Sequence, residues 1–369
     1  MEQKALFDLY VDYLIGNSGE VTATGLSAVS NGLVSHDQVT RLLNGHHGEF
    51  TAAAYWKRIK PLIREVNDPE GVMIIDDFVE EKPHSKENDL IAYHYSHLQG
   101  GPVKGINIVH LLYSVAQTAQ RVNIPVAFEL VRKTETRTDP KTGKRQRFSL
   151  VNKNQIARDL LHQATYLNHI PYQYVLADTW YASAENMVYV NRIAERQKLK
   201  KDFVFGLKAN RQVALSKGAL RRKEFVQVTD LRLEPGGVHQ IWLKDVPFPL
   251  LLAKEVYVNK DQSTATLFLV TSQLDLSYQQ LISLYPVRWK IEESHKSLKN
   301  NASLAKSPTK VARTQANHVF ASFCALVKLE LLKIRNQLNH FAIKRTIQVQ
   351  AARAAMNQLN KMNYSINTA

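Results

Sequence analysis

The stretch VMIIDD, residues 72–77, joins four consecutive apolar residues to two aspartates. After the turn-forming segment DPEG at 68–71, such a run is typical of a short buried strand, and the aspartates then follow its carboxyl end. The pattern returns at residues 174–178, where YVLA precedes Asp178. Because sites in open α/β sheets form at the carboxyl ends of strands, the two stretches predict carboxylates gathered at one sheet edge.

Alternating strands and helices surround these two stretches. We expect strands at 103–113, 124–131 and 203–208 and helices at 154–168 and 182–197. Residues 225–272 instead hold four short strand-like runs separated by turn residues, which predicts an antiparallel meander. The segment 132–147 carries seven basic and two acidic residues and is expected to be a mobile basic loop. The fold class is therefore α/β, with an antiparallel β insertion.

Helical patterns occupy both ends of the chain. Residues 1–66 suit either a helix-turn-helix DNA-binding domain or a plain helical bundle, with a helix start at Ser35-His36-Asp37. Helical periodicity returns after residue 272 and continues to about residue 360. We predict a helical N-terminal DNA-binding domain (1–66), a catalytic domain in two parts (67–209 and 273–330) around the β insertion (210–272), and a basic helical C-terminal region (331–369).

The composition is that of a folded globular protein, with 44% hydrophobic and 22% charged residues in a chain of 369. The single cysteine, Cys324, excludes an internal disulfide framework and a thiolate zinc site, and it favours a reducing compartment. We expect it to fill core space. The sequence shows neither a signal peptide nor an apolar run long enough to cross a membrane, so we expect a cytoplasmic protein without a membrane partner.

Positive charge is concentrated towards the C-terminus. The formal net charge is +15, and from Ser294 onwards the chain holds twelve Lys or Arg and one acid, Glu330. A basic patch of this kind favours a polyanionic partner, because each cation placed on a phosphate releases condensed counterions. A uniformly basic solvated surface does not explain this distribution.

The stretch LYPVRWKIEESHKSLKN, residues 284–300, carries four candidate functional residues on one predicted helix. At about 100° per residue, Tyr285, Arg288, Glu292 and Lys299 fall within one arc of about 60°. A separate arc holds the apolar residues Val287, Ile291 and Leu298. Glu292 then lies at the border of the core stripe, whereas Glu293 points well away from it. A solvated charged helix face is the alternative interpretation.

Asp76, Asp178 and Glu292 together form a carboxylate set suited to metal ions. Taken alone, Asp178 is more typical of a helix N-cap or a turn residue than of a metal ligand, and the same alternative applies to Asp76. Three carboxylates can hold two Mg²⁺ ions about 3.5–4 Å apart, which activate a water or a 3′ hydroxyl and stabilise the leaving oxygen. No protein nucleophile is then required.

The spacing Tyr, two residues, Arg, three residues, Glu, six residues, Lys in 285–299 resembles the signature of bacterial insertion-sequence transposases. These are cut-and-paste DDE enzymes with a β insertion before the final glutamate. Further stretches that resemble their motifs are IIDD at 74–77, LADTWYAS at 176–183 and FVFGLKANRQV at 203–213. The resemblance spans nearly the whole chain and implies a ribonuclease H-like catalytic domain.

Several residue roles are implied by this resemblance. It makes Asp76, Asp178 and Glu292 the catalytic ligands of two Mg²⁺ ions, for which Mn²⁺ can substitute, with Asp77 as an alternative first ligand. Tyr285, Arg288 and Lys299 become contacts to the phosphate of the transposon end. Lys208 and Arg211 match positions that face DNA, or else form a solvated strand end. Trp242 and Trp289 are candidates for stacking on a flipped base, or else packing residues.

The implied function is a DNA transposase that cuts and joins the ends of an insertion sequence through a hairpin intermediate. Its partners would be double-stranded DNA, as terminal inverted repeats and target, and a second copy of the chain in a synaptic complex on the bacterial nucleoid. Two alternatives remain. One is a related nuclease or Holliday junction resolvase, and the other is a sequence-specific DNA-binding protein without catalysis.

Overall fold

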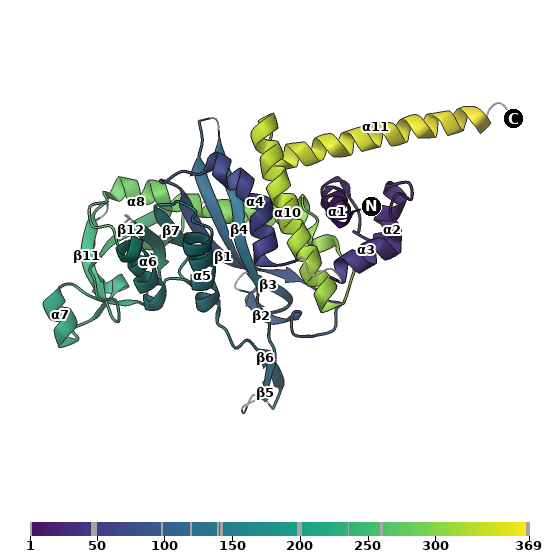
Figure 1. The fold of residues 1–369 in the computed structure, drawn as a ribbon. Coiled ribbons are helices and arrows are strands. Elements are labelled where there is room, and N and C mark those ends of the chain that lie inside the picture. Colours follow the sequence, from purple (N-terminus) through teal and green to yellow (C-terminus); the bar gives the residue numbers. More distant parts are fainter. Residues whose placement is uncertain are drawn as a thin grey trace. The chain divides into compact units, whose positions relative to one another are not determined.

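The computed structural model describes residues 2–366 except 46–49, 97–98, 119, 139, 141–142, 198–200, 235 and 259–260, and it leaves out the side chains of 196–197 and 363–366. The chain forms two compact units. The terminal unit comprises Met1–Leu62, Val79–Ile106 and Glu293–Ala369, and the central unit comprises Ile63–Phe78 and Asn107–Glu292. Figure 1 shows the course of the chain and labels its elements.

One large sheet has the strand order β10-β9-β11-β12-β13-β8-β7-β1-β3-β2, with β4 paired to β3. Strands β1, β7 and β8 are parallel neighbours, and the strands from β8 outward to β10 pair antiparallel. The strands are β1 (Val72–Glu81), β2 (Ala92–Ser96), β3 (Gly101–Ala116), β4 (Arg121–Leu130), β7 (Tyr174–Ala177), β8 (Asp202–Leu207), β9 (Gln212–Ala214), β10 (Val226–Gln227), β11 (Val238–Leu243), β12 (Leu250–Val258) and β13 (Thr264–Thr271).

Helices complete the central unit. They are α5 (Lys153–His162), which continues as the π-helical segment Gln163–Leu167, α6 (Ala184–Gln197), α7 (Lys217–Arg222), α8 (Tyr278–Leu284), a 3-10 turn (Tyr285–Arg288) and the start of α9 (Trp289–Asn300). Helix α5 begins where the Asn152 side chain accepts from Gln155 N, and α8 begins with a capping box of Ser277 and Gln280. Each start is thus fixed by local side chains.

The core of the central unit explains how the sheet faces are used. Alternate residues of a strand point to opposite faces, and Val72, Ile74 and Leu176 pack in one cluster with Leu281 and Ile291. This face of β1 and β7 is therefore covered by the segment from α8 to α9. Helices α5 and α6 pack against one another and contact β4 and β8 respectively.

The mixed α/β class expected from the sequence is confirmed, and the buried strand at 174–177 has the expected bounds. Three local expectations were wrong. Strand β1 runs on to Glu81 instead of ending at Ile75. Its pairing with β7 ends at Ala177, but β1 also pairs with β3 on its other side. Residues 285–288 form a 3-10 turn rather than α-helix. The run at 225–233 yields only the two-residue β10 and a 3-10 turn.

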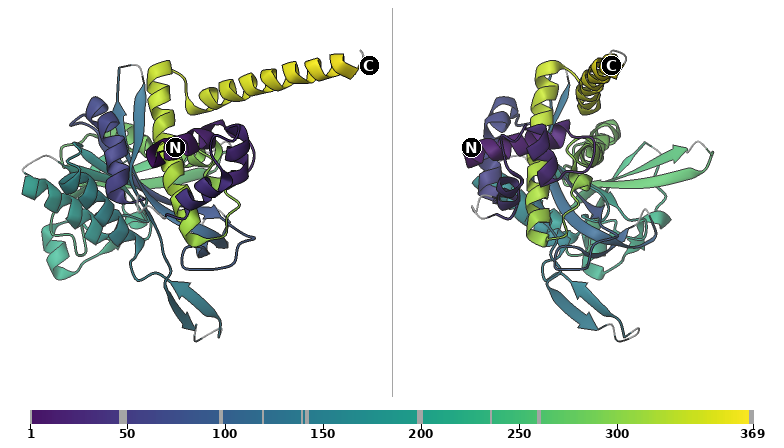
Figure 2. Two further views of the ribbon diagram at one scale, coloured as in Figure 1. Left: turned by 45° about the vertical axis from the view of Figure 1, so that its right-hand side comes forward. Right: turned by 90° about the vertical axis from the view of Figure 1, so that its right-hand side faces the viewer.

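The basic segment 132–147 is also not the loop that its composition predicts. It forms the antiparallel hairpin of β5 (Glu135–Thr138) and β6 (Arg145–Phe148), in which the Arg137 guanidinium lies 4.0 Å from the centre of the Phe148 ring. Cross-strand contact of this kind orders residues that composition alone assigns to a loop. Figure 2 shows this hairpin and the β12–β13 ribbon extending from the sheet.

The terminal unit is built mainly from helices: α1 (Gln3–Gly16), α2 (Ala23–Val29), α3 (His36–Leu43), α4 (Ala52–Val66), α10 (Ala312–Asn336) and α11 (His340–Ile366). Helix α4 gives its last residues to the central unit. Helix α3 begins at the expected place, with a capping box of Ser35 and Gln38. Helix α10 is the buried centre, packed against α1 and α11, and its Cys324 is buried as expected.

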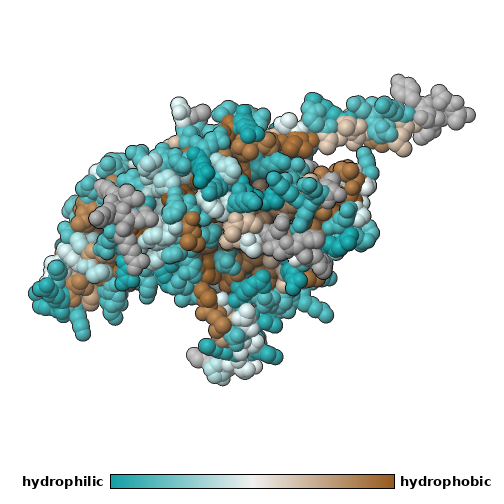
Figure 3. All heavy atoms as spheres, in the orientation of Figure 1, coloured by the Kyte–Doolittle hydropathy of each residue, from teal (hydrophilic) through white to brown (hydrophobic). Residues whose placement is uncertain are grey.

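Helix α11 is anchored at its start and exposed along the rest. Lys344 donates to the backbone oxygens of Ile15 and Asn17, and His340 lies 2.8 Å from the buried Glu330 of α10. Beyond this anchor, apolar side chains such as Val349, Met356 and Leu359 are exposed, as Figure 3 shows along this helix. Within the described residues, no helix has the length and apolar character needed to cross a membrane.

Candidate active site

The register of two parallel strands brings Asp76 and Asp178 together. Ile75 of β1 pairs with Ala177 of β7. The residue that follows each of them is an aspartate, Asp76 or Asp178. Neighbouring strands lie about 4.8 Å apart, and Asp76 and Asp178 continue the face that Ile74 and Leu176 turn towards α8 and α9. Two carboxylates therefore meet beside the buried core of the central unit.

Their electrostatics reflect this crowding. Burial, then the charges of Asp178 and Asp77, raise the pKa of Asp76 to about 8. Burial also raises the pKa of Asp178, while hydrogen bonds from Trp180 N and Tyr181 N and the charge of Arg288 work against that rise. Two desolvated carboxylates at one place favour a bound proton or a cation.

Asp77, the alternative first ligand, faces the other side of β1. Its carboxylate accepts from Lys153 Nζ at 2.7 and 2.8 Å, from Tyr181 Oη at 2.8 Å and from Asn107 Nδ2 at 2.7 Å. Strand alternation causes this difference, because consecutive residues point to opposite faces. Asp77 is thus saturated by local donors, whereas Asp76 lies beside Asp178.

Arg288 joins the helical segment to this pair. Its Nη2 donates to Glu292 Oε1 at 2.9 Å, and its Nη1 lies 3.9 Å from Asp76 Oδ2. The Arg288 side chain is 9% exposed and that of Glu292 42% exposed. Glu292 therefore does border the core, as the sequence pattern predicts, while its neighbour Glu293 is exposed. Arg288 Nε is buried and lacks a hydrogen-bond partner in the described part of the chain.

Tyr285 lies beneath the end of β7. It is buried, its hydroxyl donates to Ala177 O at 3.4 Å, and burial raises its pKa to about 12. Gly206 of β8 makes room for it, because a Cβ at this glycine would come within 2.9 Å of the Tyr285 hydroxyl. Tyr285 and Arg288 are three residues apart in a 3-10 turn, where such positions align.

The remaining predicted residues are distributed more widely. Lys299 belongs to the terminal unit, where its Nζ donates to Val79 O at 3.2 Å and lies 3.8 Å from Glu80 Oε2. Arg211 N donates to Lys208 O in the turn after β8. Trp242 is half-buried within β11, and Trp289 is 54% exposed with the Arg288 guanidinium 4.5 Å from its ring centre.

The structure also brings side chains to this place that the sequence patterns did not single out. Lys153 and Tyr181 bind Asp77, and Trp180 lies two residues beyond Asp178 with its ring near Lys153 and Lys208. Tyr181 and Trp180 are part of the stretch LADTWYAS, so their position next to a strand-end aspartate was the available signal. Lys153 lies far away in sequence, and no spacing rule connects it to Asp77.

The donor set partly fits divalent metal ions. Carboxylate oxygens are the ligands that Mg²⁺ prefers, and burial together with the charges of Asp178 and Asp77 raises the pKa of Asp76 although Arg288 lies nearby. Asp76 and Asp178 fit one ion. Glu292 is held by Arg288, and across the described ranges no group of three or more His, Cys, Asp or Glu is assembled for a metal. Glu292 joins such a site only if it leaves Arg288.

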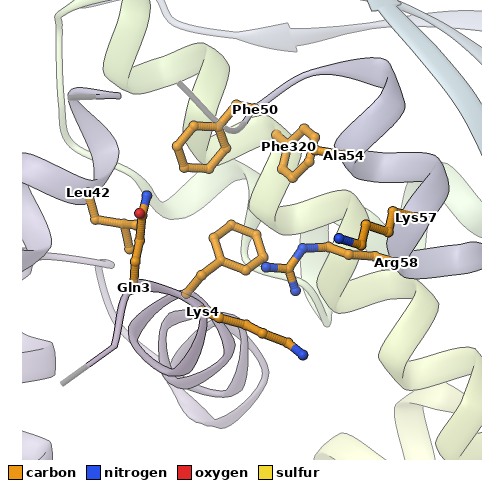
Figure 4. Close-up of a pocket in the computed structure, with 9 residues that line it drawn as sticks. Gln3, Lys4, Leu42, Phe50, Ala54, Lys57, Arg58 and Phe320 are labelled. Carbon is orange, nitrogen blue, oxygen red and sulfur yellow. The ribbon is translucent and has the colours of Figure 1, made fainter. Parts of the chain in front are cut away.

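A separate cavity of about 530 Å³ lies within the terminal unit and is drawn in Figure 4. It is lined by the phenylalanine cluster Phe7, Phe50 and Phe320 and by the basic residues Lys4, Lys57 and Arg58. No carboxylate is among the described residues that line it. Among the described residues, this cavity therefore offers aromatic and basic groups but no carboxylate ligand.

Two comparisons with protein families bear on this geometry. Residues 1–216 match the model of a DDE superfamily endonuclease, and residues 131–328 match the model of a transposase DDE domain. Asp76 lies within the first match, Asp178 within both and Glu292 within the second. A search of curated proteins gave no match.

Proposed function

Because the chain belongs to the DDE superfamily of endonucleases and transposases, whose substrate is DNA, we propose that it is the cut-and-paste transposase of an insertion sequence. The fold is ribonuclease H-like, with a large mixed sheet and helices around it. The observation that carries the proposal is the meeting of Asp76 and Asp178 directly after the last pair of the parallel strands β1 and β7, beside the Arg288–Glu292 pair.

Asp76, Asp178 and Glu292 are the residues that would hold two Mg²⁺ ions, with Mn²⁺ as a substitute. Bound there, the ions supply Lewis-acid activation of a water or a 3′ hydroxyl and stabilise the leaving oxygen. We leave Asp77 out of this set, because its carboxylate already accepts hydrogen bonds from Lys153, Tyr181 and Asn107. Its own backbone N–H donates to Asp76 Oδ1 at 2.8 Å and so orients that carboxylate.

Arg288 is the residue that would bind the phosphate of the transposon end. A guanidinium offers a planar fork of donors to phosphate oxygens, and the buried Arg288 Nε has no hydrogen-bond partner among the residues that are described. A phosphate that takes the donors now on Glu292 would leave that carboxylate available as a ligand. Tyr285 supports Arg288 from below, and Lys299 would contribute a further cation to the same DNA end.

Other parts of the chain would bind the rest of the DNA. We assign recognition of the inverted repeat to the helical region 1–66, and backbone binding to the exposed basic residues of α11, which include Arg345, Arg353 and Lys361. Two copies of the chain would pair the two ends in a synaptic complex, and cleavage would proceed through a hairpin intermediate. The membership in the insertion-sequence group with the Tyr-Arg-Glu-Lys signature is part of this proposal.

The test uses a supercoiled plasmid that carries the element with its terminal inverted repeats. The wild-type protein with Mg²⁺ should release the element and form hairpin ends, which denaturing gels detect. Asp178→Asn and Glu292→Gln should abolish cleavage and keep end binding, because each removes a ligand oxygen without changing size. Glu293→Gln, at the exposed neighbouring position, is the matched control. Full cleavage by either ligand variant would overturn the proposal.

A hydrolytic endonuclease is the second candidate, since one of the two matching family models is described as an endonuclease. The two candidates differ in the joining step. With pre-cleaved ends that carry free 3′ hydroxyls, a transposase inserts them into a target plasmid, whereas a nuclease or junction resolvase gives no joined product. A DNA-binding protein without catalysis would instead keep its full biological effect in the Asp178→Asn variant.

A further inference from the structure

The β5–β6 hairpin is attached to the sheet beside the candidate active site. Val131 N, directly after β4, donates to Asn107 O at 2.9 Å, and the Asn107 side chain donates to Asp77 Oδ2 at 2.7 Å. On the returning side, α5 begins with Lys153, whose Nζ lies 2.7 Å from Asp77 Oδ1. All these residues belong to the central unit, and Figure 2 shows the hairpin projecting away from the sheet. The hairpin thus projects from the place where the carboxylates of β1 gather.

The strand register gives the hairpin one face of a single chemical character. Thr136 lies opposite Arg147, and Thr138 lies opposite Arg145. Directly opposed residues share a face of a two-stranded sheet, and so do residues two apart along one strand. We call this surface the arginine face, which consists of Thr136, Thr138, Arg145 and Arg147. It presents two guanidinium groups and two hydroxyl groups.

The opposite face of the hairpin is used by the hairpin itself. Glu135 lies there opposite Phe148, and Arg137 lies opposite Gln146. The Arg137 guanidinium is 4.0 Å from the centre of the Phe148 ring, so this cation is engaged in a cross-strand contact. The Glu135 carboxylate stands on the same face and offsets its positive charge. The two faces therefore differ, because only the arginine face offers uncompensated charge of one sign.

The chemistry of the arginine face suits a polyanion better than a protein partner. Protein interfaces bury aromatic and large aliphatic side chains at their centre, and the four residues of this face supply neither. A two-stranded hairpin is at best marginally stable in water, and the like charges of Arg145 and Arg147, two residues apart on β6, repel one another. Phosphates accept hydrogen bonds from guanidinium and hydroxyl groups and remove this repulsion.

The two arginines are presented differently along β6. Arg145 is exposed, whereas Arg147 is half-buried and donates through Nη1 to Lys133 O at 3.4 Å. This bond ties the Arg147 side chain to the segment that leads from β4 into the hairpin. Arg147 thus lies nearer the base of the hairpin, and Arg145 lies further out.

We propose that the arginine face binds the phosphate backbone of duplex DNA and thereby holds the duplex next to Asp76 and Asp178. Arg145 and Arg147 each contact a phosphate, and the threonine hydroxyls donate beside them. Such contacts position a duplex without reading its sequence. The inference rests on the proposed function only for its substrate, DNA. Two duplexes share this chemistry, the flank outside the element end and the target, and the experiment distinguishes them.

The experiment measures the salt dependence of DNA binding by the full chain in EDTA, so that no cleavage occurs. The probe is a blunt duplex of unrelated sequence, and log affinity is plotted against log salt concentration. Each phosphate contact adds about 0.9 to the steepness of this plot, so Arg145→Gln combined with Arg147→Gln should lower it by about 1.8. Arg145→Lys combined with Arg147→Lys keeps both charges and should keep the wild-type steepness. Wild-type steepness in the glutamine variant overturns the proposal.

A gain of charge on the same face removes misfolding as an explanation. Thr138→Lys adds a cation to the arginine face and should make the plot steeper by about 0.9. Gln146→Lys adds the same cation to the opposite face of the hairpin and is the matched control, which should keep the wild-type steepness. Both positions are exposed. An equal increase in the two variants would show that the hairpin acts through its net charge alone, and the assignment to the arginine face would be wrong.

Two further arms identify the bound duplex. On end-containing DNA, the affinity of the glutamine variant relative to wild type should fall as the flank is lengthened, if the flank is bound. With pre-cleaved ends, insertion into a target plasmid should fall while end binding is unchanged, if the target is bound. A loss in either arm supports the proposal and names the duplex. If sedimentation shows that the glutamine variant changes only the association of two copies of the chain, the hairpin is a protein contact and the proposal is wrong.

Failure of this inference differs from failure of the proposed function. If Asp178→Asn and Glu292→Gln cleave normally while the glutamine variant still flattens the salt plot, the transposase proposal falls and the DNA-binding hairpin stands. If cleavage requires both carboxylates and the salt plot is unchanged, the inference about the hairpin alone is wrong.

Discussion

Arg288 Nη2 donates to Glu292 Oε1 at 2.9 Å, so the carboxylate proposed as the third metal ligand is held by the residue four positions before it. The same guanidinium lies 3.9 Å from Asp76 through Nη1. One cation thus faces carboxylates from α9 and from β1. Any ligand that draws Arg288 away changes the charge around both carboxylates at once.

Replacing Arg288 with lysine should test this dual role. Lysine keeps the charge but loses the planar fork, so it cannot serve Glu292 and a phosphate with the same geometry. We expect DNA cleavage to fall about a hundredfold in kcat, the size typical for loss of one positioned donor. Single-turnover assays on end-containing DNA measure this fall. Cleavage within threefold of wild type, with unchanged DNA affinity, would contradict it.

Asp76 should make the metal-free protein less stable as the pH rises. Its pKa in the folded chain is about 8, above the ordinary value of 3.8, so folding favours the protonated form. Stability is greatest below pH 4 for this group and is lost as the pH rises through about 8, by up to about 1.4 kcal/mol per pH unit. Urea unfolding in EDTA between pH 5 and 8 should show a smaller decline in Asp76→Asn than in wild type.

Gly206 should be intolerant of a side chain. A Cβ would lie 2.9 Å from the Tyr285 hydroxyl and 3.0 Å from Thr179 Cγ2, so Gly206→Ala should cost about 1–3 kcal/mol of stability and reduce cleavage by displacing residues next to Asp178. Tyr285→Phe in the same chain removes the nearest atom and should restore part of the stability. Gly218→Ala, where only the end of Arg222 is close, is the control, and thermal melting compares all four proteins.

Strand alternation explains what the sequence could predict at this site and what it could not. The repeated pattern of apolar run and aspartate places Asp76 and Asp178 correctly on neighbouring strands, because β1 and β7 are buried and parallel. The choice between Asp76 and Asp77 depended on which face of β1 meets α9, and that is a property of packing. Lys153 comes from α5, 76 residues further along the chain, and only the tertiary fold brings it to Asp77.

Helical geometry had a similar limit. The angular argument for residues 285–299 assumed one continuous α-helix, yet Tyr285–Arg288 is a 3-10 turn with Pro286 at its start. Tyr285 is consequently buried under β7 rather than placed on an open stripe. The predicted apolar arc is confirmed for Ile291 and Leu298, because both lie within the regular helix and are fully buried.

A double-mutant cycle should reveal a coupling energy between Asp77 and Lys153. Both side chains are mostly buried, so Lys153→Met leaves Asp77 with neutral donors only and should cost about 2–4 kcal/mol. Asp77→Asn should relieve much of that loss in the double variant. Urea unfolding of the four proteins gives the coupling energy, and additive losses would show that the pair does not interact.

Glu330 should stabilise the anchoring of α11. Its side chain is 1% exposed and lies 2.7 Å from Lys333 Nζ and 2.8 Å from His340 Nε2. These groups hold the pKa of Glu330 below its ordinary value of 4.5 despite burial. Its contribution is therefore present above that value and is lost as the pH falls through the lower pKa of the folded state. Glu330→Gln should lower the unfolding free energy by about 3–5 kcal/mol at pH 7, measured by urea titration.

The solitary cysteine supplies an internal reporter for these measurements. Cys324 is buried in α10, and burial raises the pKa of its thiol to about 12, so the closed protein resists thiol-directed reagents. A maleimide can then modify it only during transient opening of the helices around α10. Cys324 is a core residue with no chemical role. Labelling rates, compared among the variants above, therefore measure how often the terminal unit opens around it.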